Sequence, residues 1–496
     1  MSLQVSPTPA IGELSRARRY GVLAICCMSL LIVGLDNTIV NVGLPSIGRE
    51  LHAGVSGLQW TVDAYTLVIA SLLVLSGSTA DRLGRKRTFQ TGLVFFSLGS
   101  LLCSLAPNLP LLVAFRALQA IGGSMLNPVA MSIITNVFLD PRERAQAIGV
   151  WAGMTGISLG LGPVVGGALV ASVGWRSMFW INVPIGIAAV ILTARYVPRS
   201  RAPHPRPIDA VGQVLVIVTL ATITFGIIEG RAHGWGSPLI VGAFVLGVAA
   251  LVALLLYEPR RTQPLLELHF FRSVPFSGAA VIAVAAFASL GGFLFLNTLY
   301  LQEARGLSPL QAGLDTLPMA GMTLVLAPLS GRIVGRHGTR PVFFIAGIGL
   351  TLSALMLTGV TAHTSFAWLF GAYVAFGVGF GVVNAPITNT AVSAMPRTQA
   401  GVAAAIVSTS RQVGQTLGVA VVGVLATVGV GSAFRTRLPA ASHVGWWILV
   451  GLGVVIFVVG LSSSSAWAQR SAEKMAASLP HSGRDADDPP LVAAEL

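Results

Sequence analysis

The sequence predicts an all-α integral membrane protein that crosses the bilayer many times. Of its 496 residues, 54% are hydrophobic and only 10% are charged, and the mean hydropathy is +0.79, far above the range of soluble chains. The apolar stretches are continuous over about 20 residues, the length of a helix that spans a hydrocarbon core. They do not alternate in short segments as the strands of a β-barrel do. The membrane spans are therefore expected to be helices.

Fourteen spans are expected along the chain. They start near residues 21, 60, 89, 109, 145, 178, 210, 238, 278, 312, 341, 366, 400 and 443. An even number of spans places both ends of the chain on the same side of the membrane. The proline-rich, basic stretch 198–207 (PRSRAPHPRP) predicts a stiff linker between the sixth and seventh spans.

The distribution of basic residues predicts on which side of the membrane both ends of the chain lie. Most of the 31 Lys and Arg fall on the side of the N-terminus, in groups such as residues 16–19, 82–87 and 195–206. Under the positive-inside rule this side is the cytoplasm, so both termini are expected there. A net charge of +13 suggests nucleic acid as a partner in a soluble protein, but here the charges are spread over membrane-flanking loops, which argues against that function.

A repeated loop indicates an internal duplication. Residues 77–87 read GSTADRLGRKR, and residues 331–340 read GRIVGRHGTR, with Gly77, Arg82 and Gly84 matched at a constant offset of 254. The predicted division is a cytoplasmic N-terminus (1–19), a first six-helix half (20–197), a cytoplasmic linker (198–209), two inserted helices (210–258), a second six-helix half (259–464) and a disordered cytoplasmic tail (465–496).

Ordered motifs along nearly the whole chain resemble one transporter branch. They are LDNTIVNVGLP (35–45), QWTVDAYTL (59–67), the 77–87 loop, RALQAIG (116–122), GLGPVVGG (160–167), WRSMFWINVPIG (175–186), YLQEARGLSPLQAGLDTLPMA (300–320) and RQVGQTLG (411–418). Together they resemble the fourteen-span drug:proton antiporter branch of the major facilitator superfamily. Two departures stand out: Ala120 replaces a usual glycine, and Gly335 replaces the acid expected in the second-half loop.

The resemblance implies a fold and a function. The fold would be two six-helix halves plus two inserted helices, and the function would be proton-coupled export of amphipathic organic compounds by alternating access. The chain would act as a monomer in the cytoplasmic membrane of a bacterium, with protons as the coupling ion and no other cofactor. A dedicated exporter of one metabolite or antibiotic, a proton channel and a non-transporting sensor remain as alternatives.

Three ionisable residues are expected deep in the first half. At 1.5 Å per residue, Asp36 in the first span and Asp63 in the second reach nearly the same depth, and Arg116 in the fourth lies about a turn away. Charges inside a membrane usually mark ion or proton paths, although a structural ion pair is an alternative. The resemblance implies proton coupling by Asp36 and Arg116. Asp63 is expected either to contact the charge of a substrate, which its depth favours, or to belong to the proton path.

Arg411 is the deep charge of the second half. No acid is expected at its depth, so Gln412, helix carbonyls, water or the substrate are its candidate partners. Arg411 and Gln412 are therefore expected to bind substrate.

Two further groups are expected to serve the conformational change. The loop residues Gly77, Asp81, Arg82, Gly84 and Arg85 are predicted to form a tight turn and a latch on the cytoplasmic side, with topogenic charges as the simpler alternative. Small residues in the fifth span let helices approach closely, and the resemblance makes them an antiporter motif: Gly156, Gly160, Gly162, Pro163, Gly166 and Gly167.

Enzymatic and metal-binding functions are not expected. The three cysteines, Cys26, Cys27 and Cys103, fall within apolar spans and predict neither a disulfide framework nor a metal site. There is no HExxH motif, and the only lysines, Lys86 and Lys474, follow no Walker A pattern, so ATP hydrolysis is not predicted.

Overall fold

The computed structural model describes residues 15–202, 208–261, 264–393, 395, 399–426 and 434–478, and all regular elements among them are helical. The helices of the first half are α1 (Arg16–Glu50), α2 (Val55–Leu83), α3 (Arg85–Ser104), α4 (Leu109–Val137), α5 (Pro141–Ser172), α6 (Ser177–Trp180) and α7 (Asn182–Tyr196). Two helices follow, α8 (Ala210–His233) and α9 (Pro238–Tyr257).

The second half begins after two short 3₁₀ turns, Glu258–Arg260 and Leu268–Arg272. Its helices are α10 (Val274–Leu299), which continues into a π turn (Tyr300–Ala304), α11 (Pro309–Asp315), α12 (Leu317–His337), α13 (Arg340–Leu357), α14 (Phe366–Ser393), α15 (Ala400–Ala426) and α16 (Phe434–Ser463). A last helix, α17 (Ala466–Ser478), occupies the start of the segment that was expected to be disordered. The rest of that tail lies outside the described residues, as do residues 1–14 and 203–207 of the expected N-terminus and linker.

Twelve of the described helices are long and apolar enough to cross a bilayer, two fewer than the fourteen expected. The two long helices outside that set are α3 and α15. The expected sixth span is broken into α6 and α7, and the expected tenth into α11 and α12.

Polar side chains explain where several helices begin. The first backbone N–H groups of a helix have no partner within it, and a side-chain oxygen just before the helix can accept from them. Asn108 does so for α4, Asp140 for α5, Asp209 for α8 and Ser237 for α9. Ser308 forms a full capping box with Gln311 at α11.

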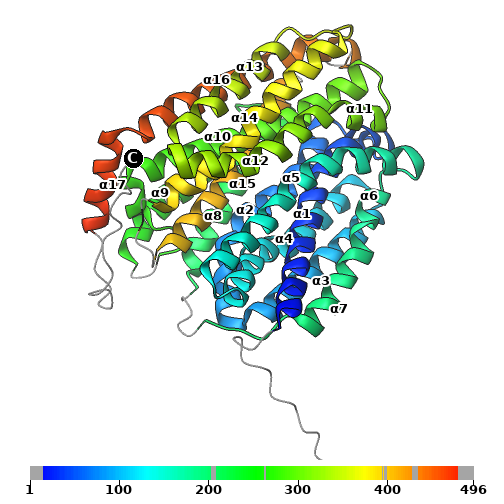
Figure 1. Cartoon of the computed structure of the whole chain (residues 1–496). Coiled ribbons are helices and arrows are strands. Elements are labelled where there is room, and N and C mark those ends of the chain that lie inside the picture. Colours follow the sequence, from blue (N-terminus) through cyan, green and yellow to red (C-terminus); the bar gives the residue numbers. More distant parts are fainter. Residues whose placement is uncertain are drawn as a thin grey trace, which may run out of the picture.

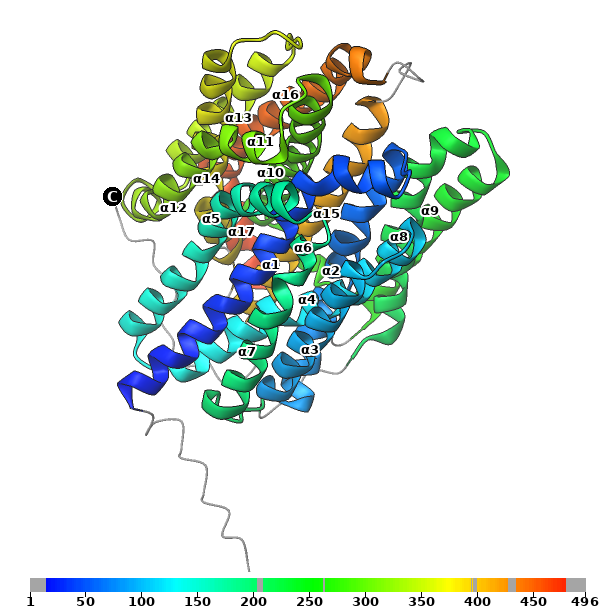
Figure 2. The same ribbon diagram turned by 90° about the vertical axis from the view of Figure 1, so that its right-hand side faces the viewer.

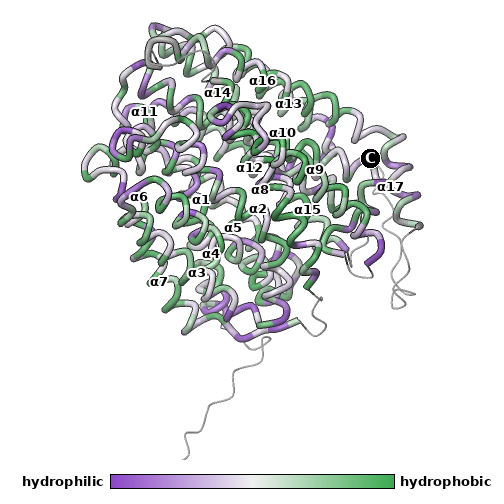
Figure 3. Tube along the Cα trace, turned by 180° about the vertical axis from the view of Figure 1, so that it is seen from behind, coloured by the Kyte–Doolittle hydropathy of each residue, from purple (hydrophilic) through white to green (hydrophobic). Residues whose placement is uncertain are grey.

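The helices assemble into two bundles with α8 and α9 at the side (Figures 1 and 2). Helix α8 contacts α2 of the first half and α15 of the second, and Gln213 Nε2 donates to the Ser71 carbonyl oxygen at 2.7 Å. Hydrophilic residues gather at the ends of the helices, and hydrophobic ones along their length (Figure 3). Large apolar side chains on α9, such as Val245 and Leu256, are exposed, as expected of a helix that faces lipid.

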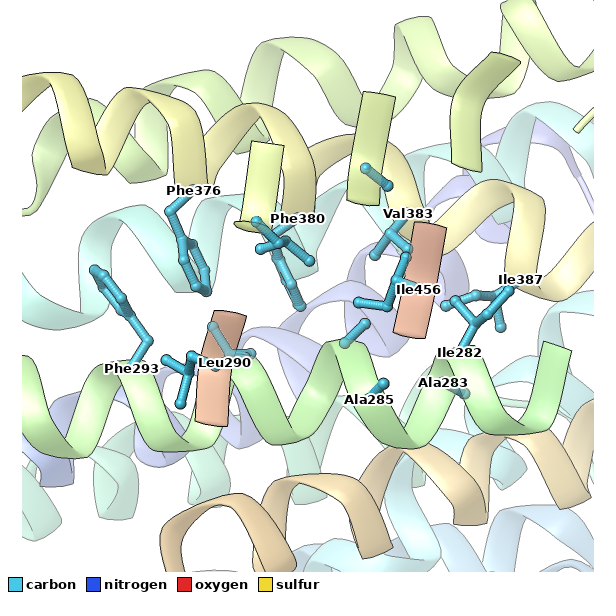
Figure 4. Close-up of a cluster of buried hydrophobic side chains, with 14 of the residues drawn as sticks. Ile282, Ala283, Ala285, Leu290, Phe293, Phe376, Phe380, Val383, Ile387 and Ile456 are labelled. Atoms are coloured by element: carbon cyan, nitrogen blue, oxygen red, sulfur yellow. The ribbon is translucent and has the colours of Figure 1, made fainter. Parts of the chain in front are cut away.

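Aromatic rings pack among aliphatic side chains in the core of the second half (Figure 4). The rings of Phe293 and Phe376 stack with centroids 4.1 Å apart, and Phe376 and Phe380 follow at 6.1 Å. Tyr373 meets Phe293 edge to face and donates from its hydroxyl to Asn297 Oδ1 at 2.7 Å. Buried rings of this kind pack α10 against α14.

In the following, the basic end is the end of the bundle where α1 begins and where α2 meets α3. The opposite end holds the turn between α1 and α2.

Candidate functional site in the first half and between the halves

A buried polar cluster surrounds Asp36 at the centre of the first half. Arg116 Nη1 on α4 donates to Asp36 Oδ2 at 2.5 Å. Gln119 Nε2 donates to Asp36 Oδ1 at 2.8 Å, and Asn182 Nδ2 donates to the same oxygen at 3.0 Å. Asp36 and Arg116 are each only 1% exposed. The carboxylate therefore has three side-chain donors and no contact with solvent.

Arg116 is held on its other sides as well. Its Nε donates to the carbonyl oxygen of Thr61 on α2 at 3.1 Å, and its Nη1 also donates to Gln119 Oε1 at 2.7 Å. The ring of Tyr65 lies 4.2 Å from its guanidinium carbon, a cation–π contact. A buried ion pair with this many partners is destabilised strongly if either charge is lost, because the other is left uncompensated.

The sequence analysis expected Asp36 and Arg116 to act together, and the structure brings them into contact. It did not single out Gln119, Asn182 or Tyr65. Gln119 and Asn182 stand inside the motifs that were quoted, and Gln119 follows Arg116 by three residues, on the same face of α4. Asn182 is positioned by the break between α6 and α7, since it is the first residue of α7.

Asp63 lies on α2 near the level of the cluster but takes no part in it. Its carboxylate is fully buried, Oδ1 accepts a long hydrogen bond of 3.4 Å from Thr66, and Oδ2 has no partner among the described residues. Thr66 in turn accepts from Thr416 Oγ1 on α15 at 2.9 Å. Asp63 therefore lies beside the contact between the two halves. It is closed to solvent in this conformation, although its depth favoured contact with the charge of a substrate.

Arg411 and Gln412 lie on α15. Arg411 Nη2 donates to Thr388 Oγ1 at 2.6 Å and to the carbonyl oxygen of Asn384 at 3.5 Å, both on α14. Its guanidinium lies 5.8 Å from the ring centre of Phe287. Within the described part of the chain no carboxylate pairs with Arg411, and its Nε and Gln412 Oε1 have no hydrogen-bond partner.

The loop at the basic end is built differently from the expected turn. Gly77 lies inside α2, so its predicted place in the turn was wrong. Gly84, with φ 97°, separates α2 from α3, and Gly338, with φ 74°, ends α12 in the same way. Asp81 and Arg85 form a long ion pair of 3.9 Å. The Arg85 N–H donates to the Ser200 carbonyl oxygen at 3.0 Å, which fastens the loop to the linker after α7.

The small residues of α5 face three other helices, α1, α12 and α11. A Cβ at Gly166 would lie 3.1 Å from Ile39 of α1, and one at Gly162 would collide with Thr38. Gly156 and Gly160 instead face Leu324 and Ala320 of α12.

Two other small residues of the motif, Gly167 and Pro163, lie against α11. A Cβ at Gly167 would lie 2.5 Å from the Pro309 carbonyl oxygen and 2.8 Å from the Leu310 Cα. The Pro163 carbonyl oxygen packs against Gly313. The absence of side chains on α5 therefore allows its backbone to touch both α1 and the second half.

The hydrogen bonds between the two halves cluster from the middle of the bundle to the opposite end. Gln59 Nε2 donates to the carbonyl oxygens of Val419 and Ala420, at 3.1 and 2.7 Å, and Gln302 Nε2 donates to the Val42 carbonyl oxygen at 2.8 Å. At the basic end, the ion pair between Arg19 and Glu143 stays within the first half. The helices of the two halves diverge there (Figures 1 and 2). The structure is thus closed at the opposite end.

Relatives with known names cover most of this chain. The tetracenomycin C resistance and export protein of Streptomyces glaucescens is 36% identical over 443 residues, which are 88% of this chain and 81% of that protein. The multidrug resistance protein Stp of Mycobacterium tuberculosis is 33% identical over 414 residues, or 84% of this chain and 77% of that protein. Both are named for resistance to drugs.

Solved structures share the fold at low sequence identity. A bacterial homolog of the human lysosomal transporter Spinster, described as inward-facing and occupied, has a TM-score of 0.64 at 17% identity and covers 93% of this chain and 98% of that one. A D-xylose–proton symporter has a TM-score of 0.64 at 14% identity and covers 89% of this chain and 97% of that one. Residues 26–419 match the family description, so this chain is a multi-pass transporter of the Major Facilitator Superfamily.

Proposed function

We propose that this chain exports amphipathic organic compounds, including drugs, across a bacterial cytoplasmic membrane, driven by protons that move inward. The observation that carries the proposal is that relatives matching over most of the chain are named for drug resistance and export. A structure closed at the opposite end fits one state of an alternating-access cycle, in which each side opens in turn.

The cluster around Asp36 supports the assignment of proton coupling to Asp36 and Arg116. A carboxylate can hold either a proton or its arginine partner, and the two compete for the same charge. In this state Arg116 and the amides of Gln119 and Asn182 donate hydrogen bonds to both oxygens of the Asp36 carboxylate. Movement of α4 against α1 would weaken these bonds and let a proton replace Arg116.

Arg411, Gln412 and Asp63 are proposed to face the substrate path or its gate. Arg411 and Gln412 retain unpaired polar atoms on a helix between the halves, as a binding site for polar groups of a substrate requires. Asp63 is buried at the contact of α2 with α15, a position that in this conformation supports a role in the proton path and the gate better than direct contact with substrate.

The loop and the α5 motif are proposed to set the conformational equilibrium. Asp81, Arg82, Gly84 and Arg85 would form the latch at the cytoplasmic side, with Gly77 in the helix before it. The small residues of α5 would form the contact on which the halves rock: Gly156, Gly160, Gly162, Pro163, Gly166 and Gly167.

We also propose fourteen spans with both termini in the cytoplasm. Helix α3 has 20 residues and α15 has 27, so each is at least about 30 Å long, enough to cross the hydrocarbon core. Their polar residues, such as Arg411 and Gln415, lower their hydropathy but point into the bundle, where partners exist. The basic end is then the cytoplasmic end. The proposed division is two six-helix halves, 20–197 and 259–464, with an insert at 210–258, acting as a monomer.

A dedicated exporter of one antibiotic is the second candidate. It is favoured by relatives named for a single compound, such as the methylenomycin A resistance protein of Streptomyces coelicolor, 34% identical, and the puromycin resistance protein of Streptomyces alboniger, also 34% identical. A panel of chemically unrelated substrates separates the two candidates, because a dedicated exporter transports only one of them.

Uptake of a dye panel into inverted membrane vesicles, driven by a pH gradient, tests the function. We expect the wild type to accumulate several dyes and Asp36→Asn to lose at least about tenfold of this activity, since the amide of asparagine cannot take up or release the coupling proton. Asp140→Asn is the matched control, because asparagine also caps a helix and Asp140 lies at the start of α5.

Exchange of labelled for unlabelled dye without a pH gradient separates coupling from folding. Asp36→Asn should still exchange dye if only coupling is lost. Full gradient-driven uptake by Asp36→Asn would remove Asp36 from the mechanism, and no uptake of any dye by the wild type would contradict drug export.

A further inference from the structure

Two buried carboxylates meet at one end of the inserted helix pair, outside the site described above. Asp209 caps the start of α8: its Oδ1 accepts from the Gly212 N–H at 2.9 Å and from the Tyr257 hydroxyl at 3.2 Å. Glu258 directly follows the last residue of α9. Asp209 is 6% exposed and Glu258 is not exposed at all.

The free oxygens of these two side chains converge above Gly212. A Cβ added to Gly212 would lie 2.7 Å from Glu258 Oε1 and 3.0 Å from Asp209 Oδ2. Asp209 Oδ2 and both carboxylate oxygens of Glu258 have no hydrogen-bond partner among the described residues. Only glycine leaves room for this approach, and three buried acceptor atoms are left without a donor.

The charged and titratable groups around the pair do not neutralise it. Tyr257 donates to Asp209, and the Arg261 guanidinium lies over the Tyr257 ring, 5.4 Å from its centre. Arg260 Nη1 donates to the Leu256 carbonyl oxygen. Glu267 adds a further negative charge nearby.

Backbone groups do not supply the missing donors either. The backbone N–H groups of Leu265 and Leu266 lie near Glu258 and lower its pKa, but burial is the larger effect and raises it, and neither N–H completes a hydrogen bond to the carboxylate. Within the described ranges, then, neither carboxylate has a cationic partner.

We propose that Asp209 and Glu258 bind one proton between them, so that one acid donates to the other. Two carboxylates that face each other in a buried site cannot both carry a charge at low cost, and a shared proton supplies the missing donor. A divalent cation fits less well. Calcium takes six to eight oxygen ligands, and the described residues contain no group of three or more His, Cys, Asp or Glu that could hold a metal.

The site joins the inserted pair to the first half. Gln213, next to Gly212, donates to the Ser71 carbonyl oxygen of α2. A proton on the pair fastens the start of α8 to the end of α9 and keeps this bond in place. When the proton leaves, two like charges repel across Gly212 and the end of the insert loosens.

The melting temperature of the purified full-length protein, measured from about pH 5 to about pH 9, tests the proposal, because buried carboxyl groups titrate in this range. The folded protein holds the shared proton more tightly than the unfolded chain, so its stability falls as the pH rises. In Glu258→Gln the amide donates to Asp209 at every pH. We expect the melting temperature of the wild type to fall by at least about 2 °C relative to Glu258→Gln across the scan. Glu267→Gln removes a nearby charge but leaves the pair intact, so its melting temperature should fall with pH as that of the wild type does.

Equal pH dependence of the wild type and Glu258→Gln would overturn the proposal. A wild type stabilised at high pH by millimolar calcium or sodium, with no such effect in Glu258→Gln, would also overturn it, since the pair would then be a cation site. If Glu258→Gln does not fold, Asp209→Asn takes its place, because asparagine also caps α8. The infrared band of a protonated carboxyl group, present in the wild type and reduced in Asp209→Asn, provides a second readout that does not depend on melting.

Discussion

In the proposed transport path, Asp63 is a buried carboxylate that has no cationic partner among the described residues. It is fully buried, and one of its oxygens has no partner among the described residues. An ionised carboxylate in such a place is costly, so it favours either protonation or a conformational change that readmits water. Its link through Thr66 to Thr416 means that either event would act on the contact between the halves.

We expect Asp63→Asn to reduce gradient-driven efflux of a cationic and of a neutral dye together, by at least about tenfold, because an amide cannot titrate. Efflux of both dyes in cells that express equal amounts of protein is the measurement. A substrate contact would behave differently: the cationic dye would be lost and the neutral dye retained, because only a cation gains from the carboxylate. That second pattern would place Asp63 in the substrate site.

At the scale of residues, the sequence predicts charges better than the groups that position them. Asp36, Asp63 and Arg116 stand out because a charged residue in an apolar stretch is rare. Gln119 and Asn182 carry uncharged amides, which do not stand out in the sequence as a charge does. Only the fold shows that both amides donate to one carboxylate. The accessibility of Asp63 could not be predicted, because it depends on which state brings α15 against α2.

At the scale of elements, α5 is one of the helices of the first half that also touch the second half. Its backbone approaches α1 at Gly162 and Gly166 and approaches α11 at Gly167. Such contacts depend on the missing side chains, since even one methyl group would have to displace backbone atoms of the neighbouring helix. The prediction that this motif packs neighbouring helices closely is confirmed by these contacts, while its part in transport stays a proposal.

We expect Gly167→Ala to weaken the contact of α5 with α11 by about 1–3 kcal/mol, the usual cost of overpacking. The closed arrangement at the opposite end would become less populated, and transport would fall by about fivefold or more. Accessibility of a cysteine introduced at Leu310 to a membrane-impermeant reagent should rise in the variant. Gly153→Ala is the matched control on the same helix, because a Cβ there meets nothing within 4 Å. An equal loss of transport in both variants would mean that alanine disturbs helix α5 itself, and not its contact with α11.

Several helix starts were predicted from the sequence, but the breaks inside two of the expected spans were not. Starts near residues 109, 210, 238 and 366 agree with α4, α8, α9 and α14, because in all four cases a polar side chain that caps the helix stands just before an apolar run. The interruptions between α6 and α7 and between α11 and α12 each lie just before a proline, Pro184 or Pro318, which has no N–H to donate to the carbonyl four residues earlier. The sequence analysis did not use this signal. Helix α17 was missed because its composition resembles that of a tail, yet Ser471 Oγ accepts from the Val274 N–H at 2.9 Å and ties it to α10.

At the scale of the whole molecule, the duplication found in the sequence reappears as two helix bundles. Gly84 and Gly338, matched in the repeat, both end a helix with positive φ. The halves touch from the middle of the bundle to the opposite end. A transporter that uses alternating access has to break these contacts in every cycle, so a bond that cannot break should stop it.

A disulfide across the contact tests this requirement. The hydroxyl oxygens of Thr66 and Thr416 are 2.9 Å apart, so the double variant Thr66→Cys, Thr416→Cys places two sulfurs close enough to bond with small adjustment. After oxidation we expect the cross-linked protein to lose transport, and a reductant should restore it, because the disulfide holds the halves together while the reduced thiols do not. Each single variant, treated with the same oxidant, controls for damage to the three native cysteines, which are buried. Alkylation and mass spectrometry of the same samples establish how much protein is cross-linked. Transport that persists in fully cross-linked protein would mean that α2 and α15 stay together throughout the cycle, and that the halves do not separate at this contact.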